Sequence, residues 1–219
     1  GKSYSIGWLS HLLTSLYKSK DDKKRIFDSI IIVTDRTNLD DQLRGTVKSL
    51  SKVDGVVFGA EKGSRELREF LEKGKDIIIT TIQKFPYISE DINALGDKKF
   101  AVIIDEVHSS QNGELSKELK RTLTRNEDEE EEDFTLESYL EEQIQTRGRQ
   151  KHISFFGFTG TPKEKTLEIF GTKQSDNKFK PFHVYSMRQS INEGYTLDVL
   201  QNYSTYKRYF KVKEVKEDV

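Results

Sequence analysis

The sequence predicts an α/β protein with a doubly wound, mostly parallel sheet and helices on both faces of that sheet. Apolar runs of strand length recur along the chain, and amphipathic helical segments separate them. The runs are apolar at consecutive positions, which is typical of strands that are covered on both faces. Polar residues follow four of these runs. In an open parallel sheet that edge is where ligands bind.

The first half of the predicted sheet alternates with helices in order. A helix opens the chain, and residues 26–33 form an apolar strand run. A second helix follows it, and residues 56–58 form a short strand. The apolar positions that predict these two helices recur at helical spacing: Trp8, Leu9, Leu12, Leu13, Leu16 and Tyr17 in the first, and Leu39, Leu43, Val47 and Leu50 in the second.

A third helix is predicted between Ser64 as its N-cap and Gly74 as its C-terminal stop. Three further strands follow, and a helix carrying Leu115, Leu119 and Leu123 separates the last two. These strands are residues 77–79, residues 100–104 and residues 153–158.

Two regions are expected to be additions to this pattern. Residues 126–150 read as an insertion that opens with a block of acidic residues, either a self-repelling loop or an acidic docking site, and continues with a helix over 134–145. Past Pro162 we expect an edge strand over 184–187, a helical turn over 188–193 that Gly194 ends, and an extended segment over 199–210.

Composition bounds the class of protein. Hydrophobic residues make up 34% of the 219 and charged residues 33%, and the net charge is −1, so any attraction to nucleic acid must be local. The absence of cysteine excludes disulfides and thiolate metal sites, and the four histidines do not form a ligand-spaced cluster. No apolar run has the length of a membrane span. A soluble, cytoplasmic protein with no membrane partner is expected.

Two short stretches carry candidate chemistry. Asp105 and Glu106 end a buried strand, and adjacent carboxylates there suit Mg²⁺ on a nucleotide phosphate, although an ordinary loop is the alternative. Gly1-Lys2-Ser3 directly precedes the first helix, as the last third of a P-loop does, although so short a match also arises by chance.

Five motifs occur in a fixed order along the chain: Gly-Lys-Ser, Thr-Asp-Arg-x-x-Leu-Asp-x-Gln-Leu, Thr-Thr-Ile-Gln-Lys-Phe, Asp-Glu-Val-His and Phe-Thr-Gly-Thr-Pro. This order resembles the first RecA-like motor domain of superfamily 2 helicases and translocases, and more narrowly the motor (R) subunit of type I restriction enzymes. Departures from the family pattern are Val107 at the third position of Asp-Glu-Val-His, where the family has alanine, the long insertion, and the absence of the first half of the P-loop.

The resemblance implies an ATP and Mg²⁺ site. Lys2 would reach the β- and γ-phosphates, and Ser3 and Asp105 would hold Mg²⁺. Glu106 would orient the attacking water and take its proton. The other expected nucleotide-binding residues are Gly1, His108, Thr159, Gly160 and Thr161.

The resemblance also implies double-stranded DNA as a partner, held at its phosphates without base readout. The alternative for the threonines of this set is a simple strand-end turn. The expected DNA-facing residues are Asp35, Arg36, Thr80, Thr81, Gln83 and Lys84.

The implied protein is an ATP-dependent DNA translocase of a type I restriction endonuclease, working with specificity and methyltransferase subunits. The alternatives are a superfamily 2 helicase of repair or RNA metabolism and a non-catalytic scaffold of the same fold. Residues 1–197 would form the first motor domain, and 198–219 would lead to a second. A P-loop strand upstream of Gly1 is expected beside the Asp105 strand, and the 219 residues alone are expected to hydrolyse ATP slowly or not at all.

Overall fold

The computed structural model divides the chain into two units, Gly1–Lys180 and Pro181–Val219, each described here by itself. The predicted domain boundary after residue 197 stays a prediction. The structure describes residues 1–34, 37–50, 55–59, 64–81, 95, 98–106, 152–198 and 200–201. The predicted helix around Leu119, the insertion over 126–150 with its helix over 134–145, and nearly all of the segment 199–210 lie outside these residues.

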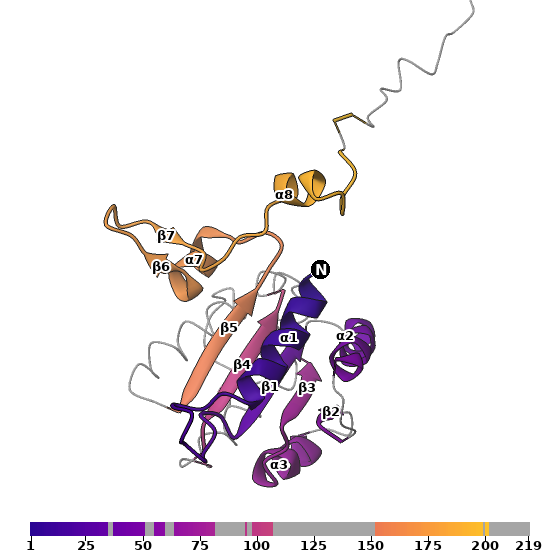
Figure 1. Cartoon of the computed structure of the whole chain (residues 1–219), viewed down its shortest axis with the longest axis vertical. Helices are drawn as coiled ribbons and strands as arrows, with labels where there is room; N and C mark the ends of the chain where they lie inside the picture. Colours follow the sequence, from indigo (N-terminus) through magenta and orange to yellow (C-terminus); the bar gives the residue numbers. More distant parts are fainter. Residues whose placement is uncertain are drawn as a thin grey trace, which may run out of the picture. The chain divides into compact units, whose positions relative to one another are not determined.

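A five-stranded parallel sheet is the framework of the first unit, as the apolar runs predicted (Figure 1). Its strand order is β2-β3-β1-β4-β5. The strands are β1 (Ser29–Thr34), β2 (Val57–Gly59), β3 (Ile77–Thr81), β4 (Phe100–Asp105) and β5 (Ile153–Phe158).

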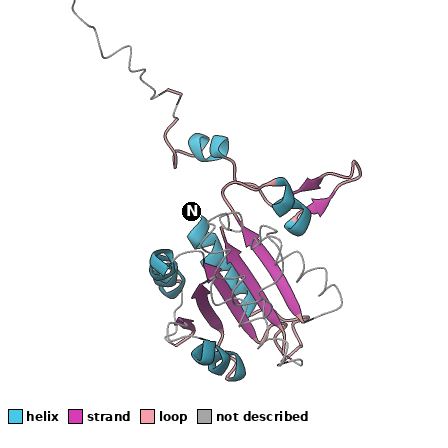
Figure 2. Cartoon of the chain, turned by 180° about the vertical axis from the view of Figure 1, so that it is seen from behind, coloured by secondary structure: helices cyan, strands magenta, loops and turns pink. Residues whose placement is uncertain are grey.

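Alternate residues of the strands enter two separate cores, one on each face of the sheet (Figures 1 and 2). On one face, Ile30 and Ile32 join the core that α1 (Lys2–Thr14) and α2 (Thr37–Ser49) cover. On the other face, Ile31 and Val33 pack with α3 (Ser64–Glu72). The sheet is therefore covered on both faces, which is why its strands carry apolar residues at consecutive positions.

Helix α1 forms as predicted, but its buried face is not the one that its largest apolar residues mark. Trp8 and Leu12 are 62% and 64% exposed, whereas Ile6 and Ser10 are fully buried. Gly7 explains the choice, because a Cβ there would lie only 2.7 Å from Leu50 Cδ1 of the segment that follows α2. The close approach of the two helices selects the face that carries small residues.

The neighbours of β4 within these residues are β1 and β5, which pair with it in parallel on its two sides. The strand expected upstream of Gly1 lies outside the sequence and stays a prediction. The end strands are β2 and β5, and the residues of β5 are only partly buried, whereas β1, β3 and β4 are buried throughout.

A small helix and hairpin that the sequence did not predict follow β5. They are α7 (Glu164–Phe170), β6 (Thr172–Lys173) and the antiparallel β7 (Phe179–Lys180). Gly171 joins the helix to the hairpin, and a Cβ there would lie 2.4 Å from the carbonyl oxygen of Leu167. Strands of two residues are too short to show a period in the sequence.

In the second unit, the predicted strand over 184–187 is wrong, because these residues lead into α8 (Met187–Asn192). Ser186 accounts for the difference: its side chain accepts a hydrogen bond from the backbone nitrogen of Gln189 at 3.1 Å and so caps the helix. The predicted helical turn is confirmed, and Gly194 follows it in the left-handed region at φ +78°.

Among the described residues, no helix is both long and apolar enough to cross a membrane.

Replacement of Tyr185 by phenylalanine should return the pKa of Glu193 toward its ordinary value. A hydrogen bond from the Tyr185 hydroxyl at 2.6 Å, and then one from Gln189 at 2.8 Å, lower the pKa of this carboxyl. The pKa of Glu193 is lower in the folded chain than in the unfolded chain, so these hydrogen bonds stabilise the fold at pH values above the unfolded pKa. That stabilisation is lost as the pH falls through the folded pKa. Carboxyl-detected NMR titration of Glu193 measures the shift.

The same hydrogen bond raises the pKa of Tyr185, so its contribution is also lost when the pH rises through that raised value. Tyr195→Phe, at a residue that is 81% exposed, is the matched control. An unchanged Glu193 titration in Tyr185→Phe would contradict this account of α8.

Candidate nucleotide site

The candidate site lies at the edge of the sheet where the parallel strands end. Thr34, Thr81 and Asp105 are the last residues of β1, β3 and β4. The N-terminus of the chain lies at the same edge, beyond the arrowheads of the strands (Figure 1). This arrangement follows from the parallel order, since parallel strands bring all their carboxyl ends to one side.

Lys2 contacts both predicted catalytic carboxylates. Its Nζ lies 2.9 Å from Asp105 Oδ1 and also contacts Glu106 Oε1. The Asp105 side chain is only 9% exposed, whereas those of Lys2 and Glu106 are 28% and 30% exposed. A single ammonium thus offsets one of the two negative charges of a nearly buried carboxylate and its neighbour, and so reduces their repulsion.

The backbone of Glu106 makes this double contact possible. Adjacent side chains of an extended strand point to opposite faces of the sheet, so Asp105 and Glu106 could not both reach one ammonium from a strand. Glu106 has φ +54°, the left-handed region that side chains other than glycine rarely adopt. That conformation costs about 1–2 kcal/mol, and such strain is typical of functional sites. Nothing in the sequence signals it.

The start of α1 presents groups suited to an anion. Gly1 is the N-cap, and its carbonyl accepts hydrogen bonds from the nitrogens of Tyr4 at 3.0 Å and Ser5 at 3.3 Å. The amides of the first helical turn point out of the helix end, where the helix dipole favours negative charge. Lys2 adds a full charge at the same place. Backbone amides and one ammonium together form an arrangement that accepts phosphate oxygens.

The turn that follows β5 borders this edge. Asp105 lies opposite Phe158 in the β4–β5 register, so Thr159 continues from the neighbouring strand end. The backbone nitrogen of Thr161 donates to Thr159 Oγ1 at 3.2 Å, which fixes a compact turn. Gly160 is exposed, and a Cβ added there would meet nothing within 4 Å.

Oxygen ligands for Mg²⁺ are available from Asp105 and Ser3. Mg²⁺ is bound in nucleotide sites by one or two carboxylates together with phosphate oxygens and water, rather than by a complete protein cage. Accordingly, among the described residues no group of three or more acidic or histidine side chains gathers as a metal site. Ser3 is half-buried beside Lys2, and Lys2 already places positive charge against Asp105. The residues present therefore fit the ion.

Several predicted site residues lie outside the part of the chain that the structure describes, and their roles stay predictions. They are Asp35, Arg36, Gln83, Lys84 and His108.

Thr80 and Thr81 are described, and both are buried, at 1% and 6% exposure. The Thr80 hydroxyl is buried, and the contact of both threonines with DNA stays a prediction. Thr34, which directly precedes the predicted DNA-facing Asp35 and Arg36, donates from Oγ1 to the carbonyl oxygen of Thr80 at 3.5 Å.

Replacement of Lys2 by methionine should lower the free energy of unfolding by up to about 1 kcal/mol, because Asp105 and Glu106 lose the cation between them in a partly exposed contact. Urea unfolding measures the change, with the exposed Lys173→Met as control. Asp105→Asn added to Lys2→Met should restore part of the stability. A double variant no more stable than Lys2→Met would contradict the assignment.

The chain is similar in sequence to subunits of restriction enzymes. The chain is 26% identical over 208 residues to the endonuclease subunit of the type I restriction enzyme SauCOLORF180P of Staphylococcus aureus (strain COL), covering 89% of this chain and 18% of that protein. It is 27% identical over 188 residues to the endonuclease subunit of the type I restriction enzyme HindI of Haemophilus influenzae, covering 78% and 15%. The chain thus spans less than a fifth of the length of these curated relatives.

A solved structure with the same fold is a nuclease-deletion mutant of the Type ISP restriction-modification enzyme LlaGI in complex with a DNA substrate mimic. The TM-score is 0.50 at 13% identity, over 92% of this chain and 18% of that one. The family model of the SWI2/SNF2 ATPase matches residues 1–128, which is more than half of the chain and includes Lys2, Asp105 and Glu106. The chain belongs to the SWI2/SNF2 ATPase family.

Proposed function

We propose that this chain is the first RecA-like motor lobe of an ATP-dependent DNA translocase, the motor part of a type I restriction endonuclease subunit. The observation that carries the proposal is the convergence of Lys2, Asp105 and Glu106 at the carboxyl edge of the sheet. The names of the relatives support the restriction context. Hydrolysis of ATP would drive movement along duplex DNA before cleavage.

Four side chains have distinct parts in this proposal. Lys2, at the first turn of α1, would bind the β- and γ-phosphates as a point charge. Asp105 and the Ser3 hydroxyl would hold Mg²⁺, which would offset the negative charge on the phosphate oxygens. Glu106 orients a water for attack on the γ-phosphorus and accepts its proton at a carboxylate oxygen.

The contacts of Lys2 imply an exchange of charges on nucleotide binding. The ammonium that contacts Asp105 and Glu106 is also the one that would bind phosphate. If Lys2 turned to the phosphates, the two carboxylates would lose their cation. Asp105 would then be open to hold a divalent cation, so ATP and Mg²⁺ should bind together much better than ATP alone. Glu106 would be available to position water in that state.

Duplex DNA is the proposed track. The LlaGI structure was solved with a DNA substrate mimic, and this supports DNA as the polymer for a lobe of the same fold. The candidate contacts remain Asp35, Arg36, Thr80, Thr81, Gln83 and Lys84. Specificity and methyltransferase subunits are the proposed partners, and the cytoplasm is the proposed compartment. A second RecA-like lobe would complete the ATP site, so turnover by these 219 residues should be slow.

Glu106→Gln should keep binding of Mg·ATP while lowering single-turnover hydrolysis by about 10²–10⁴-fold, because the base is lost but the charges on phosphate remain. Lys2→Ala should instead weaken binding of a fluorescent ATP analogue at least about tenfold. Binding is measured by fluorescence titration with and without Mg²⁺, and hydrolysis by release of labelled phosphate with enzyme in excess.

Glu168→Gln on α7 is the matched control, since that carboxylate is exposed and is not among the residues proposed to bind nucleotide. Unchanged nucleotide binding in Lys2→Ala would refute the assignment of the site. Binding of ATP that persists with no hydrolysis in the wild type, even when a second RecA-like lobe is supplied, would favour the non-catalytic scaffold instead.

A further inference from the structure

A second concave site lies at the opposite edge of the same sheet. A cavity of about 320 Å³ is lined by the segment between α1 and β1, by Gly74 after α3 and by Lys98 before β4. These positions precede β1, β3 and β4, whereas the candidate nucleotide site follows them. Because these strands are five or six residues long, the two sites are separated by roughly 20 Å of sheet.

The lining of this cavity is strongly basic. Its charged residues are Lys23, Lys24, Arg25 and Lys98 against the single carboxylate of Asp28, which is four positive charges less one negative, or +3. The chain as a whole carries −1, so the basic charge is a local concentration and not a property of the entire surface. Tyr17 and Phe27 supply the aromatic part of the wall.

Two of the four cations are held in place by the fold. Arg25 Nη1 pairs with Asp76 Oδ1 at 2.5 Å and donates to the carbonyl oxygen of Thr14 at 3.3 Å. Lys98 Nζ donates to the carbonyl oxygens of Leu71 and Glu72, at 2.8 and 2.7 Å, at the end of α3. Both residues therefore offset the negative carboxyl ends of helices, which is a structural role.

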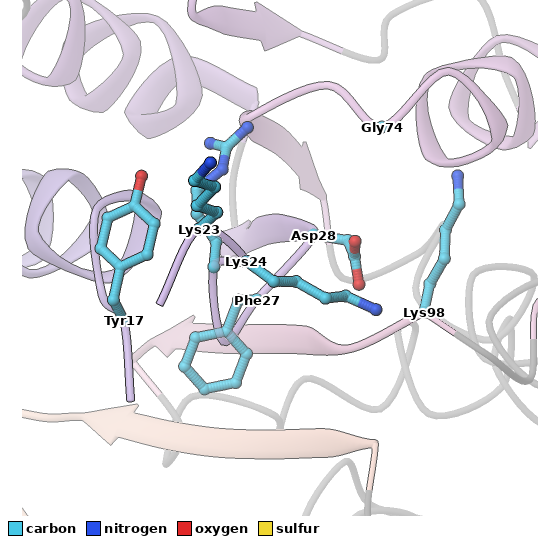
Figure 3. A pocket seen from close by; sticks show the side chains of 8 residues that line it. Tyr17, Lys23, Lys24, Phe27, Asp28, Gly74 and Lys98 are labelled. Atoms are coloured by element: carbon cyan, nitrogen blue, oxygen red, sulfur yellow. The ribbon is translucent and has the colours of Figure 1, made fainter. Parts of the chain in front are cut away.

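The other two cations of the lining, Lys23 and Lys24, have no comparable structural role. Both are exposed, and within the described part of the chain their side chains form no ion pair or hydrogen bond. The only carboxylate of the lining, Asp28, accepts a hydrogen bond from the backbone nitrogen of Lys99 at 2.8 Å. Figure 3 shows Tyr17 and Lys23 on one side of the cavity, Asp28 and Lys98 on the other, and Lys24 extending between them.

We propose that this basic pocket binds a phosphate of the DNA backbone, as a second contact remote from the nucleotide site. Lysine ammonium groups and an arginine on a concave wall suit phosphate oxygens, and they carry no base information, as a motor that moves over any sequence requires. The choice of DNA over another polyanion rests on the proposed function. The tribasic run Lys23-Lys24-Arg25, which alone would pass for a solvated turn, acquires this role only because Lys98 and the aromatic wall enclose it.

The test is binding of the 219-residue chain to a fluorescent duplex of arbitrary sequence, without nucleotide, followed by anisotropy over a range of salt. Lys23→Gln with Lys24→Gln should raise Kd roughly 3–10-fold and reduce the salt slope by about 1–2. Lys23→Arg with Lys24→Arg keeps the charge and should bind like the wild type. Lys173→Gln with Lys178→Gln is the control, because it removes the same charge from exposed residues of the β6–β7 hairpin. It should change Kd less than twofold, which is about the size of the deviation expected for independent surface substitutions.

Three results would overturn the proposal: no binding of duplex by the wild type, an equal loss in the hairpin variant, or unchanged binding in the glutamine pair. Inorganic phosphate and poly-glutamate serve as competitors. If inorganic phosphate binds the pocket while duplex binding ignores Lys23 and Lys24, the DNA assignment is wrong. Poly-glutamate that binds as tightly as duplex, with the same dependence on both lysines, would identify an acidic protein segment instead.

The same variants separate this proposal from the proposed ATPase. The glutamine pair leaves Lys2, Asp105 and Glu106 intact, so it should bind the fluorescent ATP analogue as the wild type does. If the nucleotide experiments fail and the DNA-binding experiments succeed, the proposed motor function is wrong and the proposed phosphate pocket stands.

Discussion

The contact of one ammonium with two adjacent carboxylates is the constraint on which the functional edge of this protein depends. Lys2 begins α1, and Asp105 and Glu106 end β4, so the pair joins the start of a covering helix to the centre of the sheet. Its contribution to stability is modest, because Lys2 and Glu106 are about a third exposed and pairs of that kind contribute about 0–1 kcal/mol. Its importance is positional: it holds a phosphate-binding group against the groups that would act on the phosphate.

Most of the stability comes from the buried core of the sheet and its helices. This explains how the strained backbone of Glu106 is tolerated. Large side chains of the sheet and its helices, such as Ile31, Ile78 and Leu67, are fully buried, and each such isoleucine or leucine contributes about 1.5–3 kcal/mol. The left-handed backbone of Glu106 costs about as much as one of them returns. A sheet covered on both faces can therefore hold an unfavourable conformation at its edge, where the conformation turns both carboxylates to one cation.

The two edges of the sheet have opposite electrostatic characters for a related reason. At the carboxyl edge, α1 presents its N-terminus, and the amides there favour an anion together with Lys2. At the other edge α1 and α3 present their carboxyl ends, which Arg25 and Lys98 offset. The winding of helices around a parallel sheet requires this alternation. Cations placed at the second edge for structural reasons are then available, with Lys23 and Lys24, to form a basic pocket.

The sequence by itself determined the parallel α/β class, the order of the motifs and the five strands, whose ends it predicted to within three residues. Apolar runs and helical spacing can be read from the sequence because they are local properties of the chain. It also identified Lys2, Asp105 and Glu106, because their motifs are contiguous. The tertiary structure decided which face of α1 is buried, since Gly7 permits a close approach to Leu50 that hydrophobic spacing cannot foresee. It decided that β4 lies between β1 and β5, because pairing is a long-range choice among similar apolar strands. It decided the left-handed turn at Glu106 and the enclosure of Lys23 and Lys24 by Lys98, because both depend on residues brought together across the fold.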